Sequence, residues 1–118
     1  MLDNISVGEV LGHGTWSAAF VPRPRSQVMR VMGELDIAEA PIFESAIGQH
    51  IVQDRNFVVD LRDCSYLDST IISVFIRLSR RLGKTLCVVA RPGSAVERLF
   101  RVTNLYHQLN IVPELDIE

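Results

Sequence analysis

Residues 58–72 read VVDLRDCSYLDSTII and contain the features that decide the fold. The near-continuous apolar run Phe57–Leu61 predicts a central strand that is covered on both faces. A short loop follows, and apolar residues at a spacing of three and four then predict a helix over Ser69–Leu82. Gly83 comes directly after this pattern and is a natural residue for ending a helix. The segment therefore predicts a strand, a loop and a helix in direct succession.

The start of this helix is the best candidate for a functional site. Asp68 is placed to cap the helix, and Leu67 and Ile72 are spaced as a hydrophobic staple around the cap. Ser69 and Thr70 occupy the first two helical positions, where we expect them to face water. A phosphate on Ser69 would lie beside unpaired amides at the positive end of the helix dipole. The residues alone leave a second interpretation open, which is a purely structural helix cap.

The rest of the chain alternates between strand and helix patterns. Gly12-His13-Gly14 is expected to form a turn, and Asp36 is expected to help start the segment after the second strand. Ser94 and Glu97 form a capping box for a short helix, and Asn104 is expected to end it. These patterns predict an α/β or α+β domain with a mixed, largely parallel sheet. The strands are expected at Ser17–Val21, Val28–Met32, Thr85–Ala90 and Ile111–Val112, and further helices at Pro41–Gln53 and Ser94–Val102.

The composition indicates one globular domain over residues 1–118. Hydrophobic residues make up 47% of the 118 residues and charged residues 22%, with a net charge of -2. This balance offers no broad basic field for nucleic acid or an anionic membrane. No segment resembles a signal peptide or a membrane span. Cys87 is expected in the core and Cys64 in the loop before the helix, where it is open to a reactive role; both fit a reduced, cytoplasmic compartment.

Four motifs in this order resemble the STAS domain family. They are Gly33-Glu34-Leu35-Asp36 at the end of a strand, Val58–Leu61, Leu67-Asp68-Ser69, and the helix Ala95–Phe100. The resemblance covers about residues 28–113, and residues 1–27 are a divergent N-terminal segment. It implies a STAS-like α/β fold, with a mixed, mostly parallel sheet of four to five strands and helices packed mainly on one face.

The resemblance is to anti-anti-sigma factors within this family, and it implies a partner-switching regulator without enzymatic activity. In such proteins the Ser after the motif Asp is phosphorylated by an anti-sigma factor that is also a serine kinase, and a serine phosphatase removes the phosphate. Carried over by position, Ser69 is the phosphoacceptor. The partner-binding residues are Asp36, Asp68, Ser69, Thr70 and Ile71, with Thr70 a secondary acceptor. Ile71 replaces a Gly that is common in the family, and its β-branched side chain is expected to cover this corner or to narrow which kinase can approach it.

Nucleotide or small-ligand sensing stays open, because some STAS domains are proposed to perform it, although this sequence shows no site for it. Two other interpretations also remain from the sequence. The first is a STAS-type accessory subunit that braces the ATPase of a phospholipid ABC transporter without phosphorylation. The second is an enzyme, because Asp60, Asp63 and Asp68 lie near one strand end and carboxylates can bind Mg²⁺ or act as nucleophiles. No Lys, His or Gly-rich loop accompanies them, so we expect no catalytic residues, metal or cofactor. We expect a monomer or a weak dimer, no nucleic acid partner and no direct membrane insertion.

Overall fold

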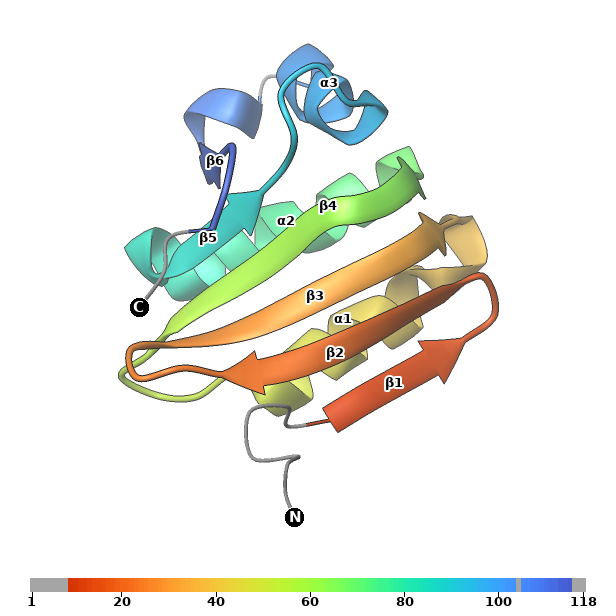
Figure 1. Cartoon of the computed structure of the whole chain (residues 1–118). Helices are drawn as coiled ribbons and strands as arrows, with labels where there is room; N and C mark the ends of the chain where they lie inside the picture. The colour runs from red at the N-terminus through yellow and green to blue at the C-terminus, as the bar shows by residue number, and fades with distance from the viewer. Residues whose placement is uncertain (1–8, 104, 116–118) are drawn as a thin grey trace.

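A computed structural model describes residues 9–103 and 105–115 of the chain. Within these residues, six strands, three α-helices and three 3₁₀ turns follow one another, and their arrangement is shown in Figure 1. The strands are β1 (Glu9–His13), β2 (Trp16–Pro22), β3 (Ser26–Leu35), β4 (Asn56–Leu67), β5 (Leu86–Val89) and β6 (Asn110–Val112). The helices are α1 (Ala40–His50), α2 (Ser69–Leu82) and α3 (Ala95–Val102), and the 3₁₀ turns are η2 (Ile37–Glu39), η3 (Gly83–Thr85) and η4 (Leu105–His107).

The strands form one mixed sheet in the order β1-β2-β3-β4-β5-β6. β1, β2 and β3 are antiparallel neighbours, whereas β3, β4, β5 and β6 pair in parallel. This arrangement confirms the predicted α/β class with a mixed sheet. The sheet has six strands rather than four to five, because the segment that was expected to turn at Gly12-His13-Gly14 is still paired with β2 as far as His13. Glycine has a low intrinsic preference for strands, so this segment is a strand because it pairs with β2 at the edge of the sheet.

Two helices cover one face of the sheet and enclose the core. α1 and α2 lie behind the sheet in Figure 1, and Phe43, Phe75 and Phe100 bring α1, α2 and α3 into one apolar cluster with the strands. The ring of Phe75 lies 5.9 Å from that of Phe43 and 5.3 Å from that of Phe100, in tilted and edge-to-face geometry. This packing fixes the position of α2 against the sheet, and therefore also the position of the residues at the start of the helix.

Strand β4 is longer than the sequence predicted. The expected loop after Leu61 is strand as far as Leu67, and its pairing with β3 shifts register between Arg30 and Met32 and between Gly33 and Glu34. Such irregularities let a polar stretch continue in a sheet, since they break the strict alternation of inward and outward side chains. Cys64 is therefore a buried strand residue rather than a loop residue.

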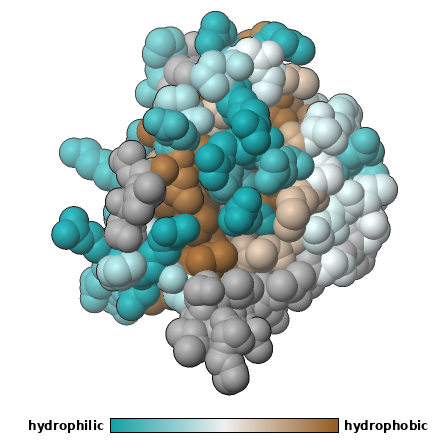
Figure 2. Space-filling view, in the orientation of Figure 1, coloured by the Kyte–Doolittle hydropathy of each residue, from teal (hydrophilic) through white to brown (hydrophobic). Residues whose placement is uncertain are grey.

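The face of the sheet away from α1 and α2 carries a small apolar cluster beside charged residues. Val28, Val58 and Val89 form this cluster on three neighbouring strands, separate from the main core. In Figure 2 the apolar side chains on this face are bordered by hydrophilic ones. Asp60 is buried here and accepts hydrogen bonds from the Arg62 guanidinium at 2.9 and 2.8 Å.

Candidate functional site

The parallel pairing of β3 and β4 brings two sequence motifs together. Leu35 and Leu67 are partners in register, so the residues that follow them, Asp36 and Asp68, leave the sheet side by side. The Asp68 amide donates to the Leu35 carbonyl at 2.8 Å and holds the two strand ends together. We call Asp36 with Asp68–Ile71 the Ser69 corner. The structure thus brings the predicted partner-binding residues into one place.

Asp68 caps α2 as the sequence predicted. Its carboxylate accepts hydrogen bonds from the Thr70 amide at 2.8 Å and from the Thr70 hydroxyl at 2.7 Å. These hydrogen bonds from Thr70, side chain first and backbone second, lower the pKa of Asp68 below its usual value. The carboxylate is therefore ionised at neutral pH. Asp36 has the corresponding role one strand away, where it accepts from the Ala38 amide at 3.1 Å and caps η2.

Ser69 and Thr70 differ in how their hydroxyls are engaged. Ser69 is the first residue of α2 and is exposed, and within the described chain its hydroxyl has no hydrogen-bond partner. Thr70 is half-buried, and its hydroxyl donates to Asp68. The geometry therefore leaves the Ser69 hydroxyl accessible at the helix N-terminus, whereas that of Thr70 is committed to the cap.

The expectation for Ile71 was wrong. Its side chain is fully buried, with 0% exposed, and it belongs to the main core rather than covering the corner. The reason is tertiary: α2 lies against the sheet, and the third helical residue falls on the face that packs inward. Ile71 therefore supplies no side-chain surface to a partner, and replacing the family's Gly does not narrow access to Ser69.

A distant hairpin supports the end of β3. Gly33 has φ +99°, and a Cβ built on it would lie 2.2 Å from the Thr15 carbonyl oxygen. The Glu34 amide donates to that same oxygen at 3.0 Å, and the Thr15 hydroxyl donates to the Glu34 carbonyl at 2.8 Å. Gly33 in the Gly-Glu-Leu-Asp motif thus permits the β1–β2 hairpin to approach the strand that leads to Asp36.

The same hairpin also contacts η2. The Trp16 indole N–H donates to Glu39 Oε1 at 2.7 Å, and both residues are buried. This contact positions η2 beside the Ser69 corner. The sequence analysis found neither residue, because the pairing joins segments that are 23 positions apart.

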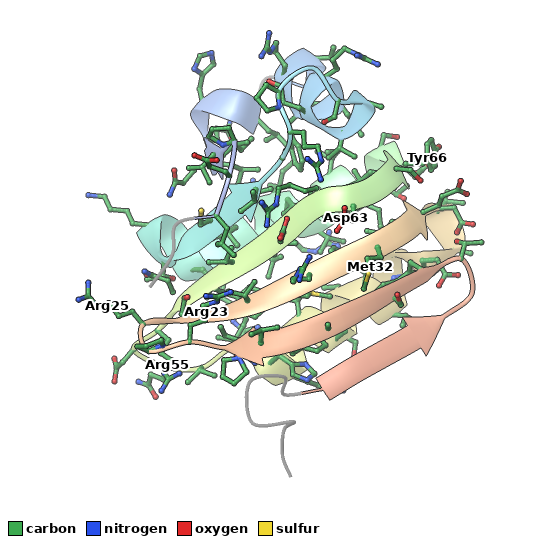
Figure 3. All side chains as sticks on the ribbon, in the orientation of Figure 1. Arg23, Arg25, Met32, Arg55, Asp63 and Tyr66 are labelled. Carbon is green, nitrogen blue, oxygen red and sulfur yellow. The ribbon has the colours of Figure 1, made fainter. Side chains whose placement is uncertain are left out.

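Tyr66 is a further residue at this site that the sequence analysis missed. It lies near the end of β4 in Figure 3, with 47% of its side chain exposed. Its hydroxyl donates to Asp68 Oδ1 at 3.4 Å. The negative charge of Asp68 raises the pKa of Tyr66, and Asp36 and Glu34 add to this effect. The available signal in the sequence was an aromatic residue two positions before Asp68.

Two of the three carboxylates considered for an enzyme, Asp60 and Asp63, are engaged by arginines, whereas Asp68 caps α2. Asp60 accepts from Arg62; burial opposes its ionisation, but the hydrogen bonds and charge of Arg62 and the charge of Arg30 lower its pKa overall. Asp63 lies 3.6 Å from both the Arg30 and the Arg91 guanidinium. Among residues 9–103 and 105–115, no group of three or more His, Cys, Asp or Glu side chains is placed to hold a metal ion.

The Cys64 thiol shows no sign of activation. Its side chain is buried, and this burial raises its pKa to about 11. The Sγ atom donates to the Tyr66 carbonyl at 3.2 Å. The thiol is therefore protonated at neutral pH, which contradicts the reactive role that was left open for it. Cys87, expected in the core, is half-buried on the other face of the sheet.

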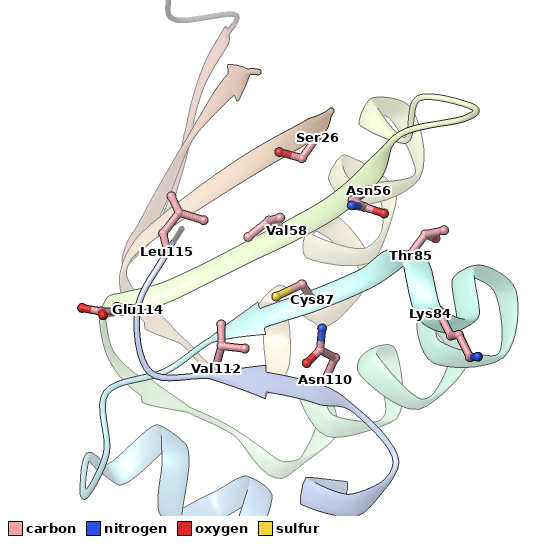
Figure 4. A pocket seen from close by; sticks show the side chains of 10 residues that line it. All are labelled: Ser26, Asn56, Val58, Lys84, Thr85, Cys87, Asn110, Val112, Glu114 and Leu115. Atoms are coloured by element: carbon pink, nitrogen blue, oxygen red, sulfur yellow. The ribbon is translucent and has the colours of Figure 1, made fainter. Parts of the chain in front are cut away.

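One pocket of about 210 Å³ lies away from the Ser69 corner (Figure 4). It is on the sheet face opposite α1 and α2, and Ser26 and Asn56, the first residues of β3 and β4, are among its lining. Ser69 follows the other end of β4, so this pocket contains none of the predicted site residues.

Comparisons with known proteins agree with this geometry. The family model described as "STAS domain" matches residues 18–116, which is most of the chain. The chain belongs to the STAS domain family. Among curated proteins, no sequence matches it.

Two solved structures are similar to this STAS domain. An anti-sigma factor antagonist from Mycobacterium paratuberculosis is 27% identical with a TM-score of 0.78, and the match covers 90% of this chain and 92% of that chain. An antisigma-factor antagonist STAS domain from Rhodobacter sphaeroides is 17% identical with a TM-score of 0.50, and its match covers 67% of this chain and 88% of that chain. The second similarity supports the fold alone. No helix in the described part of this STAS domain is long and apolar enough to span a membrane.

Proposed function

We propose that this STAS domain is an anti-sigma factor antagonist that works by partner switching and has no catalytic centre of its own. The observation that carries the proposal is Ser69: an exposed hydroxyl without a hydrogen-bond partner in the described chain, at the N-terminus of a 14-residue helix and directly after an ionised capping Asp. The similarity to the Mycobacterium paratuberculosis antagonist supports it over nearly the full length of both chains.

In this proposal the unphosphorylated corner binds an anti-sigma factor that is also a serine kinase. The kinase transfers the γ-phosphoryl group of ATP to Ser69 Oγ, the hydroxyl proton goes to the kinase's base, and ADP is left. A serine phosphatase hydrolyses the phosphate and restores binding. Asp36, Asp68, Ser69 and Thr70 form the partner-binding surface, and the protein acts in the cytoplasm as a monomer or a weak dimer, without nucleic acid.

Phosphorylation is proposed to end binding without unfolding the domain. A phosphate adds about 1.5 to 2 negative charges, and backbone amides at the start of α2 can donate hydrogen bonds to its oxygens. Asp68 is already ionised beside it, so a docked partner meets concentrated charge and added bulk. In this proposal the folded domain accommodates the phosphate, whereas the interface with the partner does not.

The experiment that tests this function measures binding to each serine-kinase anti-sigma factor of the host, purified with ADP bound. We expect the wild-type protein and Ser69→Ala to bind one of them, and phosphorylated wild-type protein to bind at least tenfold more weakly. Equal binding of the phosphorylated and unphosphorylated forms would contradict partner switching. A stable complex with membrane ATPase components instead, with no phosphate on Ser69, would support the transporter-subunit alternative.

A further inference from the structure

Large apolar side chains are exposed at five positions of the described chain, and two of these adjoin the Ser69 corner: Ile37 directly follows Asp36, and Tyr66 lies two residues before Asp68. Ile37 has 64% of its side chain exposed and Tyr66 has 47%. The other positions are Met32, Val52 and Val102. A single exposed apolar residue is ordinary, but two that adjoin the same corner can form a surface with a binding preference.

The two residues are held in place by rigid elements. Ile37 begins η2, which Asp36 caps and which packs against α2 and, through Glu39, against Trp16. Tyr66 is paired with Glu34 in the sheet, and Figure 3 shows it near the end of β4. Side chains on such elements lose little freedom when a partner binds, so each can contribute strongly to affinity.

Negative charge surrounds this apolar pair. Glu34 is the register partner of Tyr66, the Tyr66 hydroxyl donates to Asp68 Oδ1 at 3.4 Å, and Asp36 follows the neighbouring strand end beside Asp68. None of them forms an ion pair with a residue in the described part of the chain. The carboxylates therefore remain available for cationic side chains from outside the domain.

The geometry points to Ile37 and Tyr66 as the apolar anchors of the docking surface around Ser69. The partner that fits is a protein surface with an apolar pocket rimmed by arginine or lysine side chains, which match Glu34, Asp36 and Asp68. This inference rests on the proposed function, because it names the chemistry of the surface to which the Ser69 corner binds.

A basic rim is compatible with release after phosphorylation. A kinase that acts on Ser69 must hold nucleotide phosphates against its hydroxyl, so the new phosphate faces negative charge at the nucleotide rather than at the rim. The anchors and the rim contribute to binding in both states, and the repulsion is local to Ser69. Affinity for the unphosphorylated protein should therefore fall with salt, while loss on phosphorylation persists at every salt concentration.

The test measures binding of the full chain to the host's ADP-bound serine-kinase anti-sigma factors by calorimetry. We expect Ile37→Ser and Tyr66→Ala each to weaken binding by about 10- to 100-fold, as interface anchors do. Tyr66→Phe keeps the ring and should restore near wild-type affinity. Val52→Ser and Val102→Ser remove exposed apolar side chains elsewhere and should change it less than about twofold.

Charge is tested on the same complex. Glu34→Gln combined with Asp36→Asn should flatten the dependence of affinity on salt, and Asn keeps the cap of η2. Thermal unfolding of every variant separates lost binding from lost folding. If wild-type protein binds and the Ile37 and Tyr66 variants bind equally well, the anchors are wrong while the proposed function stands. If wild-type protein binds none of these kinases and Ser69 receives no phosphate, the function fails, and this inference fails with it.

Discussion

Two of the connections from a parallel strand into a helix, β4 to α2 and β5 to α3, have a serine at the helix start, and the two serine hydroxyls are engaged differently. In the segment from Gly93 to Glu97, which we call the Ser94 corner, Ser94 Oγ accepts from the Glu97 amide at 3.1 Å. The buried Glu97 carboxylate accepts from the Gly93 amide at 3.1 Å and pairs with Arg101. At the Ser69 corner, Asp68 makes the cap, and Ser69 is exposed without a hydrogen-bond partner in the described chain.

The difference separates a structural helix start from one that is available for modification. Both corners have a serine near the N-terminus of a helix, so the residue type and the dipole do not distinguish them. What distinguishes them is which side chain serves as the cap. At the Ser94 corner the serine is the cap, whereas at the Ser69 corner the preceding aspartate is. The serine at the first helical position is therefore free.

The largest expected effect compares the glycines beside the two corners. Gly33→Ala should lower the free energy of unfolding by at least about 3 kcal/mol, because its Cβ would meet the Thr15 carbonyl at 2.2 Å and φ is +99°. Gly93 has φ +78° but nothing within 4 Å of a Cβ, so Gly93→Ala should cost only about 1–2 kcal/mol. Urea unfolding of both variants measures the difference. Equal losses would mean that the hairpin does not constrain β3.

The second-largest expected effect is on the pH dependence of stability, and it comes from the carboxylate that pairs with an arginine near the Ser94 corner. Arg91, just before that corner, donates to the Arg62 carbonyl at 3.1 Å, and Arg62 pairs with the buried Asp60. The pKa of Asp60 is lowered in the folded protein. The ionised Asp60 therefore stabilises the fold at pH values above 3.8, its ordinary pKa, and this stabilisation is lost as the pH falls further. Asp60→Asn should cost about 2 kcal/mol at neutral pH.

The measurement for Asp60 is unfolding by urea from pH 7 to pH 3. The gap in stability between wild type and Asp60→Asn should narrow as the pH falls below about 4, since protonation removes the same charge. Asp68→Asn is the matched control at the Ser69 corner, where Asn also caps a helix and the gap should be small at every pH. If the difference in free energy of unfolding between wild type and Asp60→Asn stays constant over this pH range, that result contradicts an ionised Asp60–Arg62 pair.

The smallest expected effect compares the two serines directly. Ser94→Ala removes a helix cap and should lower the free energy of unfolding by about 1 kcal/mol. Ser69→Ala removes a hydroxyl that has no partner in the described chain, and the change should stay within about 0.5 kcal/mol. Thermal unfolding of the two variants resolves this difference. A loss at Ser69 as large as the loss at Ser94 would assign Ser69 a structural role.

The sequence predicted the parts of this site that depend on local patterns. The cap by Asp68, the helix from Ser69 to Leu82 and the caps by Asp36 and Ser94 follow from residue types and spacing, and the structure confirms them. The end assigned to Asn104 lies outside the described residues. Local patterns did not predict the continuation of β4 through Tyr66, because its bulged pairing with β3 is a property of the sheet.

Two other features could not be predicted because they depend on distant segments. Whether Ile71 faces a partner or the core is decided by how α2 lies against the sheet, and the structure buries it. The requirement for glycine at position 33 comes from Thr15, in a hairpin that the sequence analysis expected only as a turn. Both features depend on tertiary structure. The close approach of Thr15 to Gly33 also links the divergent N-terminal segment to the Gly-Glu-Leu-Asp motif.

The most direct test of the account maps phosphate on the intact protein after incubation with host lysate and ATP. Wild-type protein, Ser69→Ala, Thr70→Ala and Ser94→Ala are compared by intact mass and peptide analysis. The account predicts a single phosphate on Ser69 in all proteins except Ser69→Ala, which stays unmodified. Phosphate on Thr70 or Ser94, or no phosphate on any protein, would contradict the claim that an accessible hydroxyl beside an ionised cap is the switch.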